Sequence, residues 1–232
     1  MFLDVGGPIY DDEDYVRAVL GALDDLRAEH GLGPTDRSTF RTIYDELRAA
    51  QSGSFRTALC EEFLPEGRAA RSDLHRRTAE RWVHPPTSLA PDALPFVREV
   101  ARTAAVGILA NQGARVVDEL RRDGFGPHIS VWGVSDIVGL EKPSPELFTW
   151  CLAEAGVAAE EAVHIGNRLD NDVRPARRLG IRAVWVLRGE APDAPTDEQR
   201  AEADLVVSGL DGLAERLLGP DAPAIDDDRA SP

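Results

Sequence analysis

The stretch from residue 163 to residue 180 constrains the fold of this chain more than any other. It opens with an apolar run that is typical of a buried strand and breaks at Gly166 into a turn rich in amides and carboxylates. A helix follows and stops at Gly180. In open parallel α/β sheets, ligands bind where a strand ends in such a turn. A simpler interpretation is that the polar side chains of the turn only cap the helix; they are Asn167, Asp170 and Asn171.

Strand-like and helix-like segments alternate on both sides of this stretch. Short apolar runs end at Asp4 and cover residues 105–110, 129–132, 183–187 and 205–207, with helical periodicity between most of them. Such alternation predicts parallel strands joined by right-handed crossovers, with helices on both faces. We therefore predict an α/β fold with a doubly wound parallel sheet and a Rossmann-like core.

Residues 11 to about 83 interrupt this alternation with continuous helical periodicity. The segment reads as four helices, and the acidic run 11–14 favours a helix start because negative charge stabilises that end of the dipole. The aromatic residues recur at core spacing, which gives them no chemical role. We predict that residues 12–86 form an α-helical cap domain inserted into a core made of residues 1–11 and 87–220. Residues 221–232 are predicted to be an acidic disordered tail.

Composition excludes several classes of function. The 232 residues contain 26 Lys plus Arg against 41 Asp plus Glu, a net charge of −15, so the chain lacks the basic surface that nucleic-acid binding requires. No apolar run approaches the roughly 18 residues of a membrane span, and no signal-peptide pattern opens the chain. Two cysteines far apart in sequence favour a reduced, cytoplasmic protein. We expect either a monomer or a homodimer. The five histidines show no metal-ligand spacing.

Lys142 is the only lysine of the chain, since every other cationic residue is an arginine. A sequence so biased towards arginine keeps a lysine where a compact ammonium is needed and a planar guanidinium is not. Its position in a loop before a predicted helix favours a functional role, with chance as the alternative.

Four polar stretches follow predicted strands: Asp4, Ala110-Asn111, Lys142 and the run from Asn167 to Asp172. All four should therefore meet at one edge of the sheet. In their order and spacing the chain resembles the haloacid dehalogenase-like (HAD) hydrolase superfamily, in a form with an α-helical cap between the first two motifs. The motifs are Leu-Asp-Val-Gly-Gly at 3–7, Ile-Leu-Ala-Asn at 108–111, Glu-Lys-Pro at 141–143 and Gly-Asn-Arg-Leu-Asp-Asn-Asp at 166–172. The resemblance covers roughly residues 1–218.

The resemblance implies a role for each motif. Asp4 would be the nucleophile that forms an aspartyl-phosphate, and Lys142 would hold the nucleophile and the phosphoryl oxygens. Asn111 would complete the catalytic set, and the substrate would be bound by Gly6, Gly7, Ala110 and Asn111. Mg²⁺ would be held by Asp4, the Gly6 carbonyl, Asn167 and Asp172, the last either as a ligand or as the partner of one. A carboxylate approaches a phosphate dianion only where cations neutralise the repulsion.

Four positions depart from the superfamily pattern. Gly6 stands where most of its phosphatases carry a second Asp that acts as general acid and base, and Asn167 replaces the first carboxylate of the metal turn. Pro8 and Ala110 replace hydroxyl residues. Loss of the acid and base is expected to cost about 10²- to 10⁴-fold in rate, and the loss of a carboxylate predicts weak Mg²⁺ binding.

These departures leave three functions open. The first is a slow or specialised Mg²⁺-dependent phosphohydrolase acting on a small phosphomonoester. The second is a catalytically impaired binding or regulatory protein, and the third is a metal-independent 2-haloacid dehalogenase. Phosphonate cleavage through a cap Schiff base is excluded because it needs a second lysine. The arginines of the cap either meet an anionic substrate or are simply solvated; they are Arg56, Arg68, Arg71, Arg76 and Arg77.

Overall fold

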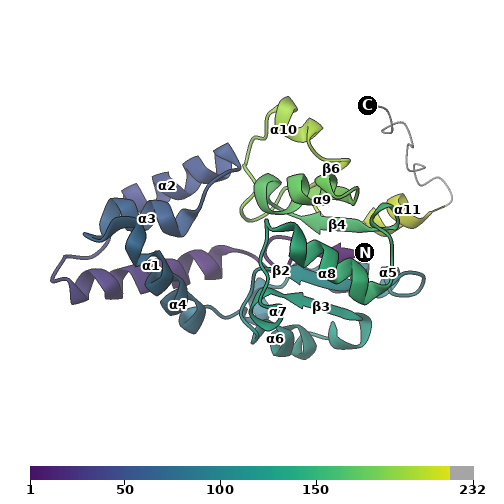
Figure 1. Ribbon diagram of the computed structural model, residues 1–232, viewed down its shortest axis with the longest axis horizontal. Coiled ribbons are helices and arrows are strands. Elements are labelled where there is room, and N and C mark those ends of the chain that lie inside the picture. Colours follow the sequence, from purple (N-terminus) through teal and green to yellow (C-terminus); the bar gives the residue numbers. More distant parts are fainter. Residues whose placement is uncertain (220–232) are drawn as a thin grey trace.

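A parallel sheet organises the fold. The computed structural model describes residues 1–219, so the predicted tail 221–232 lies outside the described residues. Within the described part, six strands pair in the order β3-β2-β1-β4-β5-β6, each parallel to its neighbours (Figure 1). The strands are β1 (Phe2–Leu3), β2 (Gly107–Ala110), β3 (Val131–Val134), β4 (Val163–Gly166), β5 (Arg182–Val186) and β6 (Leu205–Val207). This confirms the predicted doubly wound sheet.

The strand order reverses between β1 and β4. The chain adds β2 and β3 on one side of β1 and then returns to add β4, β5 and β6 on the other. At such a switch point the loops after neighbouring strands diverge and leave a crevice at the carboxyl ends. Asp4 directly follows β1 and Asn167 directly follows β4, so both lie at this crevice.

Helices cover both faces of the sheet because successive strand residues point to opposite sides. Leu3 belongs to the hydrophobic cluster under α5 (Ala93–Val100), α6 (Val116–Arg122) and α11 (Leu213–Leu218). Phe2 belongs to the cluster under α8 (Pro145–Ala155) and α9 (Arg174–Arg178). The remaining short helices are α7 (Ser135–Val138), α10 (Asp197–Ala201) and the single turns Gly67–Ala70, Pro86–Ser88, Gly126–His128 and Ala159–Glu161.

Four helices between β1 and β2 form a lobe beside the sheet (Figure 1). We call it the helical lobe; it contains α1 (Glu13–Glu29), α2 (Arg37–Ala50), α3 (Phe55–Phe63) and α4 (Arg71–Arg81). It has its own hydrophobic cluster, whose members include Val19, Leu23 and Leu59, all fully buried. Side chains of Asp36 and Ser54 cap α2 and α3 as helix-start residues do. The assignment of residues 12–86 to a separate domain stays a prediction.

Gln51 connects the end of α2 to the turn after β4. Its side-chain nitrogen donates to the Glu190 carbonyl at 2.8 Å, and its side-chain oxygen accepts from the Leu169 amide at 2.9 Å. Arg168 reaches in the other direction and donates to the Gly53 carbonyl at 2.9 Å. These hydrogen bonds hold the helical lobe over the carboxyl ends of the strands.

The structure differs locally from the predicted elements. The turn after β4 continues as a π-helical turn, Leu169–Val173, before α9 begins. The segment after β5 includes a buried Ala191 and contains α10, whose start is stabilised by a reciprocal cap between Thr196 and Gln199. Among the described residues, no helix is both long and apolar enough to cross a membrane.

Candidate active site

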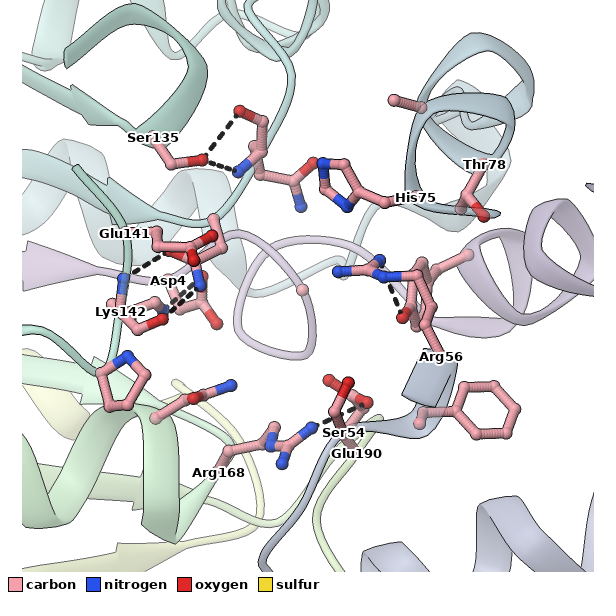
Figure 2. A pocket seen from close by; sticks show the side chains of 18 of the residues that line it. Asp4, Ser54, Arg56, His75, Thr78, Ser135, Glu141, Lys142, Arg168 and Glu190 are labelled. Carbon is pink, nitrogen blue, oxygen red and sulfur yellow. Dashed lines mark hydrogen bonds and ion pairs between the residues drawn. The ribbon is translucent and has the colours of Figure 1, made fainter. Parts of the chain in front are cut away.

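A cavity of about 690 Å³ lies between the carboxyl ends of the strands and the helical lobe. This volume falls within the range of small-molecule sites. Core residues on its wall include Asp4, Gly6, Lys142 and Asn167, and lobe residues on its wall include Arg56 and His75. Figure 2 shows Asp4 and Lys142 on one side of the cavity and Arg56 on the opposite side. The structure thus brings the predicted nucleophile and the only lysine to one ligand-sized space.

The Lys142 ammonium joins two of the predicted site carboxylates. Its Nζ lies 2.9 Å from Asp4 Oδ1 and 2.6 Å from Asp172 Oδ1, and its side chain is 2% exposed. Burial alone would lower the pKa of Lys142, but the charges of Asp172 and Asp4 outweigh it and raise the pKa. Lys142 is therefore a fixed cation in a dry position, the arrangement in which a point charge stabilises an anion most effectively.

Asn111 positions this lysine through the backbone. Its amide nitrogen donates to the Lys142 carbonyl at 2.8 Å, and its amide oxygen accepts from the Lys142 N–H at 2.7 Å. Both polar atoms of the Asn111 side chain are used in this way, so the role that the structure gives the side chain is to hold the Lys142 loop against the end of β2.

Asp4 is held by one of its two carboxylate oxygens. Oδ1 accepts from the Val5 amide at 2.8 Å and faces Lys142, whereas Oδ2 has no partner among residues 1–219. Burial raises the pKa of Asp4 to about 6; the Lys142 charge opposes this rise and the Asp172 charge adds to it. One oxygen is therefore oriented and the other is available to a ligand.

Asp172 is fully occupied by neighbouring donors. Oδ1 contacts Lys142 and the His164 Nε2 at 3.0 Å, and Oδ2 accepts from the Arg168 amide at 3.0 Å. Burial alone would raise the pKa of Asp172, but Lys142 and His164 hold it below its usual value. The carboxylate is 1% exposed and lies outside the cavity wall. Asp172 thus acts on the site through Lys142.

Asp12 is a site carboxylate that sequence reasoning missed, because the acidic run before α1 was interpreted as a helix start. It stands at the N-cap position of α1 but makes no side-chain cap hydrogen bond. Instead it is 5% exposed and lies on the cavity wall. A Cβ built at Gly6 would come within 2.4 Å of Asp12 Oδ1, so Asp12 fills the space that a side chain at position 6 would take. The sequence does contain a signal for this role. Gly6 occupies the position at which the superfamily pattern has an acidic residue, and Asp12 follows a few residues later.

The Asn167 side chain and the Glu190 backbone amide donate hydrogen bonds to this carboxylate. Asn167 Nδ2 donates to Asp12 Oδ2 at 3.0 Å and to the Arg188 carbonyl at 3.2 Å, and the Glu190 amide donates to Asp12 Oδ2 at 3.1 Å. Gly189 leaves room here, since a Cβ at that residue would lie 1.9 Å from Asp12 Oδ2. Burial, followed by the charges of Glu190 and Asp4, raises the pKa of Asp12 well above its usual value.

Two predicted substrate-binding residues lie outside the cavity wall. Gly7 has φ +78° and donates its N–H to the Tyr10 carbonyl, and a Cβ there would meet the Asn167 side chain at 2.4 Å. Ala110 is fully buried in the core at the end of β2. Gly7 and Ala110 therefore shape the walls behind the site, whereas Gly6 lies on the cavity wall itself.

The donors present fit a hard cation only weakly. Asp4 Oδ2 and the side-chain oxygen of Asn167 carry no hydrogen bond among the described residues, and Gly6 contributes backbone to the wall. Both oxygens of Asp172 already accept from protein donors. Within residues 1–219 no group of three or more His, Cys, Asp or Glu is placed to hold a metal ion. One carboxylate with neutral carbonyl oxygens makes a site of low charge, which favours weak Mg²⁺ binding.

Comparisons with known proteins match this chain to hydrolases. A family model described as HAD-hydrolase-like matches residues 139–213, which include Lys142 and the turn after β4. The phosphoserine phosphatase of Thermus thermophilus is 37% identical over 174 residues, covering 71% of this chain and 66% of that protein. The glyceraldehyde 3-phosphate phosphatase of Methanocaldococcus jannaschii is 35% identical over 98 residues, covering 42% of each. The chain thus spans about two thirds of the first relative and less than half of the second.

Solved structures share the fold over nearly the whole chain. A HAD phosphatase from Thermococcus onnurineus aligns with a TM-score of 0.65 at 22% identity, covering 94% of this chain and 97% of that one. The putative HAD-hydrolase YfnB from Bacillus subtilis, whose structure is described as bound to magnesium, aligns with a TM-score of 0.65 at 20% identity over the same shares. At these identities the similarity is one of fold.

Proposed function

This chain belongs to the haloacid dehalogenase-like hydrolase superfamily, and from that membership we propose that it hydrolyses a small phosphomonoester through an aspartyl-phosphate at Asp4. The observation that carries the proposal is the position of Lys142, whose buried ammonium fixes Asp4 Oδ1 while Asp4 Oδ2 is left for a ligand. The relatives at 37% and 35% identity are named as phosphatases, which supports the same reaction class.

The first half of the reaction transfers the phosphoryl group to the protein. Asp4 Oδ2 attacks phosphorus, a new P–O bond forms to Asp4, and the bond to the leaving alkoxide breaks. Lys142 stays between Asp4 and Asp172 and offsets the charge that accumulates on the phosphoryl oxygens. The leaving oxygen takes a proton from Asp12, whose carboxyl lies where the side chain at position 6 would be.

The second half of the reaction hydrolyses the aspartyl-phosphate and regenerates the free Asp4 carboxylate. Water attacks the phosphorus of the aspartyl-phosphate and gives its proton to the Asp12 carboxylate, and the P–O bond to Asp4 breaks. The products are inorganic phosphate and a free Asp4 carboxylate, with Asp12 protonated as at the start. In this scheme Asp12 supplies the acid and base that Gly6 lacks, and this weighs against the catalytically impaired alternative.

Mg²⁺ is proposed as the cofactor, held by the Asp4 carboxylate, the Gly6 carbonyl and the side-chain oxygen of Asn167. When bound, the ion neutralises the repulsion between a carboxylate and a phosphate dianion. Asp172 takes part only by orienting Lys142. The neutral Asn167 in place of a carboxylate predicts an affinity lower than that of a site with two carboxylates.

The dehalogenase alternative has weaker support. One neighbour is a 2-haloacid dehalogenase from Pseudomonas syringae, with a TM-score of 0.56 and 24% identity, which speaks for the fold alone. A dehalogenase needs no proton donor for a leaving halide, so the burial of Asp12 at the cavity wall favours the phosphohydrolase.

Phosphate release from a panel of phosphomonoesters, with and without Mg²⁺, tests the proposal. The panel includes phosphoserine and glyceraldehyde 3-phosphate, because the relatives' names contain these compounds. We expect release that depends on Mg²⁺, disappears in Asp4→Asn, and falls by about 10²- to 10⁴-fold in Asp12→Asn. Release that survives Asp4→Asn in a pure preparation contradicts the proposal. Halide release from 2-haloacids in the absence of metal ions establishes the third alternative instead.

A further inference from the structure

The five arginines of the helical lobe that the sequence offers as contacts for an anionic substrate divide into two groups. Three of them are tied to carboxylates on the lobe surface: Arg68 to Glu61, Arg76 to Asp73 and Glu80, and Arg77 to Glu29. The other two, Arg56 and Arg71, lie on the wall of the active-site cavity. Neither has an ion pair with any carboxylate among residues 1–219. Of these five arginines, the three on the surface are therefore paired and the two on the cavity wall have no anionic partner among the described residues.

Arg56 is held by Tyr15, but not every nitrogen of its guanidinium has a hydrogen-bond partner. Its Nη1 donates to the Tyr15 hydroxyl at 3.2 Å, and the guanidinium lies 5.7 Å from the centre of the Tyr15 ring. Its Nε is buried and has no hydrogen-bond partner. In Figure 2 the guanidinium points from α3 into the cavity, opposite Asp4 and Lys142. Its Nη2 makes no hydrogen bond among residues 1–219 and is not buried, so this end of the guanidinium is available to an acceptor in the cavity.

The electrostatics of this wall agree with the geometry. Burial, followed by the charges of Arg56 and Arg71, lowers the pKa of His75, which lines the same cavity. Asp136 and Glu141 act on His75 in the opposite direction but do not reverse the shift. Asp136 is already engaged by the Ala114 amide at 3.1 Å, and Glu190, on the far side, pairs with Arg168 at 3.4 Å. The lobe side of the cavity thus presents positive charge.

We propose that Arg56 and Arg71 form a subsite for a second anionic group, so that the substrate is a small phosphomonoester with a carboxylate or a second phosphate at its other end. This inference rests on the proposed function, because the first anionic group is the phosphoryl group that Asp4 attacks beside Lys142. A guanidinium binds carboxylate or phosphate oxygens in pairs and keeps its charge at every physiological pH. A neutral tail would leave both arginines desolvated without an acceptor.

The test compares substrates that differ in one terminal group. 3-Phosphoglycerate and glycerol 3-phosphate differ by a carboxylate in place of a neutral hydroxymethyl group, and fructose 1,6-bisphosphate and fructose 6-phosphate differ by a second phosphate. We expect at least one anionic-tail substrate to have a kcat/KM at least tenfold above that of its neutral-tail partner. Which pair shows the difference identifies the anionic group.

Variants connect this preference to the two arginines. Arg56→Gln and Arg71→Gln should each lower kcat/KM for the preferred substrate by about 10- to 100-fold, mostly through KM, and leave the neutral-tail partner within about threefold. Arg76→Gln, also on α4 but paired on the surface, is the matched control and should change neither. Equal losses for both members of a pair, or the absence of any preference in the wild type, overturn the subsite.

Binding separates failure of the subsite from failure of the proposed function. Calorimetric titration of the folded Asp4→Asn protein with each member of the pairs measures tail recognition without turnover. Tighter binding of the anionic tail that is lost in Arg56→Gln/Asp4→Asn supports the subsite even when the wild type releases no phosphate. Equal affinity for anionic and neutral tails rejects it even when the wild type is an active phosphatase.

Discussion

The side-chain amide of Asn167 donates a 3.0 Å hydrogen bond to the carboxylate of Asp12. A carboxylate at position 167 could not donate this hydrogen bond, and whenever Asp12 is ionised it would place two negative charges at this distance inside a buried wall. Gly6 and Gly189 leave the space that Asp12 occupies, since a Cβ at either would overlap it. The residues at positions 6, 167 and 189 are far apart or unrelated in the sequence. In the structure all three either leave space for the Asp12 carboxylate or donate a hydrogen bond to it.

Asn167→Asp is expected to destabilise the metal-free protein. With EDTA present, the free energy of unfolding should fall by about 1–3 kcal/mol at pH 7, because the hydrogen bond that Asn167 donates to Asp12 is lost and a second ionisable carboxyl is buried beside it. Burial beside Asp12 raises the folded pKa of the new carboxyl above its unfolded value, so the deficit should shrink as the pH falls. Urea unfolding at pH 7 and pH 5 measures both effects. Asn171→Asp in the same turn is the control, and Asp12→Asn in the same chain should restore stability.

Gly6→Ala is expected to displace Asp12. The new Cβ would lie 2.4 Å from Asp12 Oδ1, closer than any packed contact allows. If Asp12 supplies the acid and base, kcat should fall by about 10²-fold or more while KM changes little. Gly33→Ala is the control, since a Cβ there meets nothing within 4 Å and Gly33 lies outside the cavity wall. Unchanged kcat in Gly6→Ala, with the variant folded, contradicts the assignment of Asp12.

Lys142→Met is expected to be strongly destabilising as well as inactive. It removes the cation between Asp4 and Asp172, whose side chains are 16% and 1% exposed, and leaves their charges uncompensated. Breaking a buried ion pair in this way costs about 3–5 kcal/mol. Chemical denaturation of the purified variant measures the loss. Adding Asp172→Asn should recover part of the stability without recovering activity, and a double variant as unstable as Lys142→Met is the opposing result.

Tyr10→Phe tests a pH-dependent contact away from the cavity. The Tyr10 hydroxyl donates to Asp123 Oδ2 at 2.6 Å. The hydrogen bond from Arg122 holds the pKa of Asp123 below its usual value. Burial alone would raise this pKa, and the Tyr10 hydrogen bond lowers it further. A depressed carboxyl pKa stabilises the fold above pH of about 4 and ceases to do so as the pH falls through the folded pKa. The variant should lose about 1–2 kcal/mol at pH 7 and less at pH 3.

The control for this contact is Tyr44→Phe, which removes a hydroxyl that donates no hydrogen bond among the described residues. Urea unfolding of both variants at the two pH values separates the hydrogen bond from the loss of a polar atom. If Tyr10→Phe lowers the free energy of unfolding by the same amount at pH 7 and pH 3, the charge on Asp123 does not contribute to the strength of this contact.

The elements of the fold were readable from the sequence because their causes are local. Apolar runs such as 105–110 and 183–187 predicted strands β2 and β5, which are buried in the parallel sheet, and helical spacing of apolar residues predicted all four lobe helices. The order of the polar stretches after strands predicted that Asp4, Lys142 and the turn after β4 would meet, since strand ends of a parallel sheet share an edge. The lone lysine marked the fixed cation.

Tertiary structure alone decided which polar groups face the cavity. Asp12 reads as one of several acids at a helix start, and only the path of the chain after Gly6 turns it into the site. Asp172 reads as a metal ligand, but Lys142 and His164 contact its Oδ1 and the Arg168 amide donates to its Oδ2. The sequence does not distinguish Arg56 from Arg76. In the structure Arg76 forms an ion pair with Glu80, whereas Arg56 lies on the cavity wall. Local patterns specify backbone periodicity, whereas the orientation of a side chain and the identity of its partner depend on contacts between segments far apart in the chain.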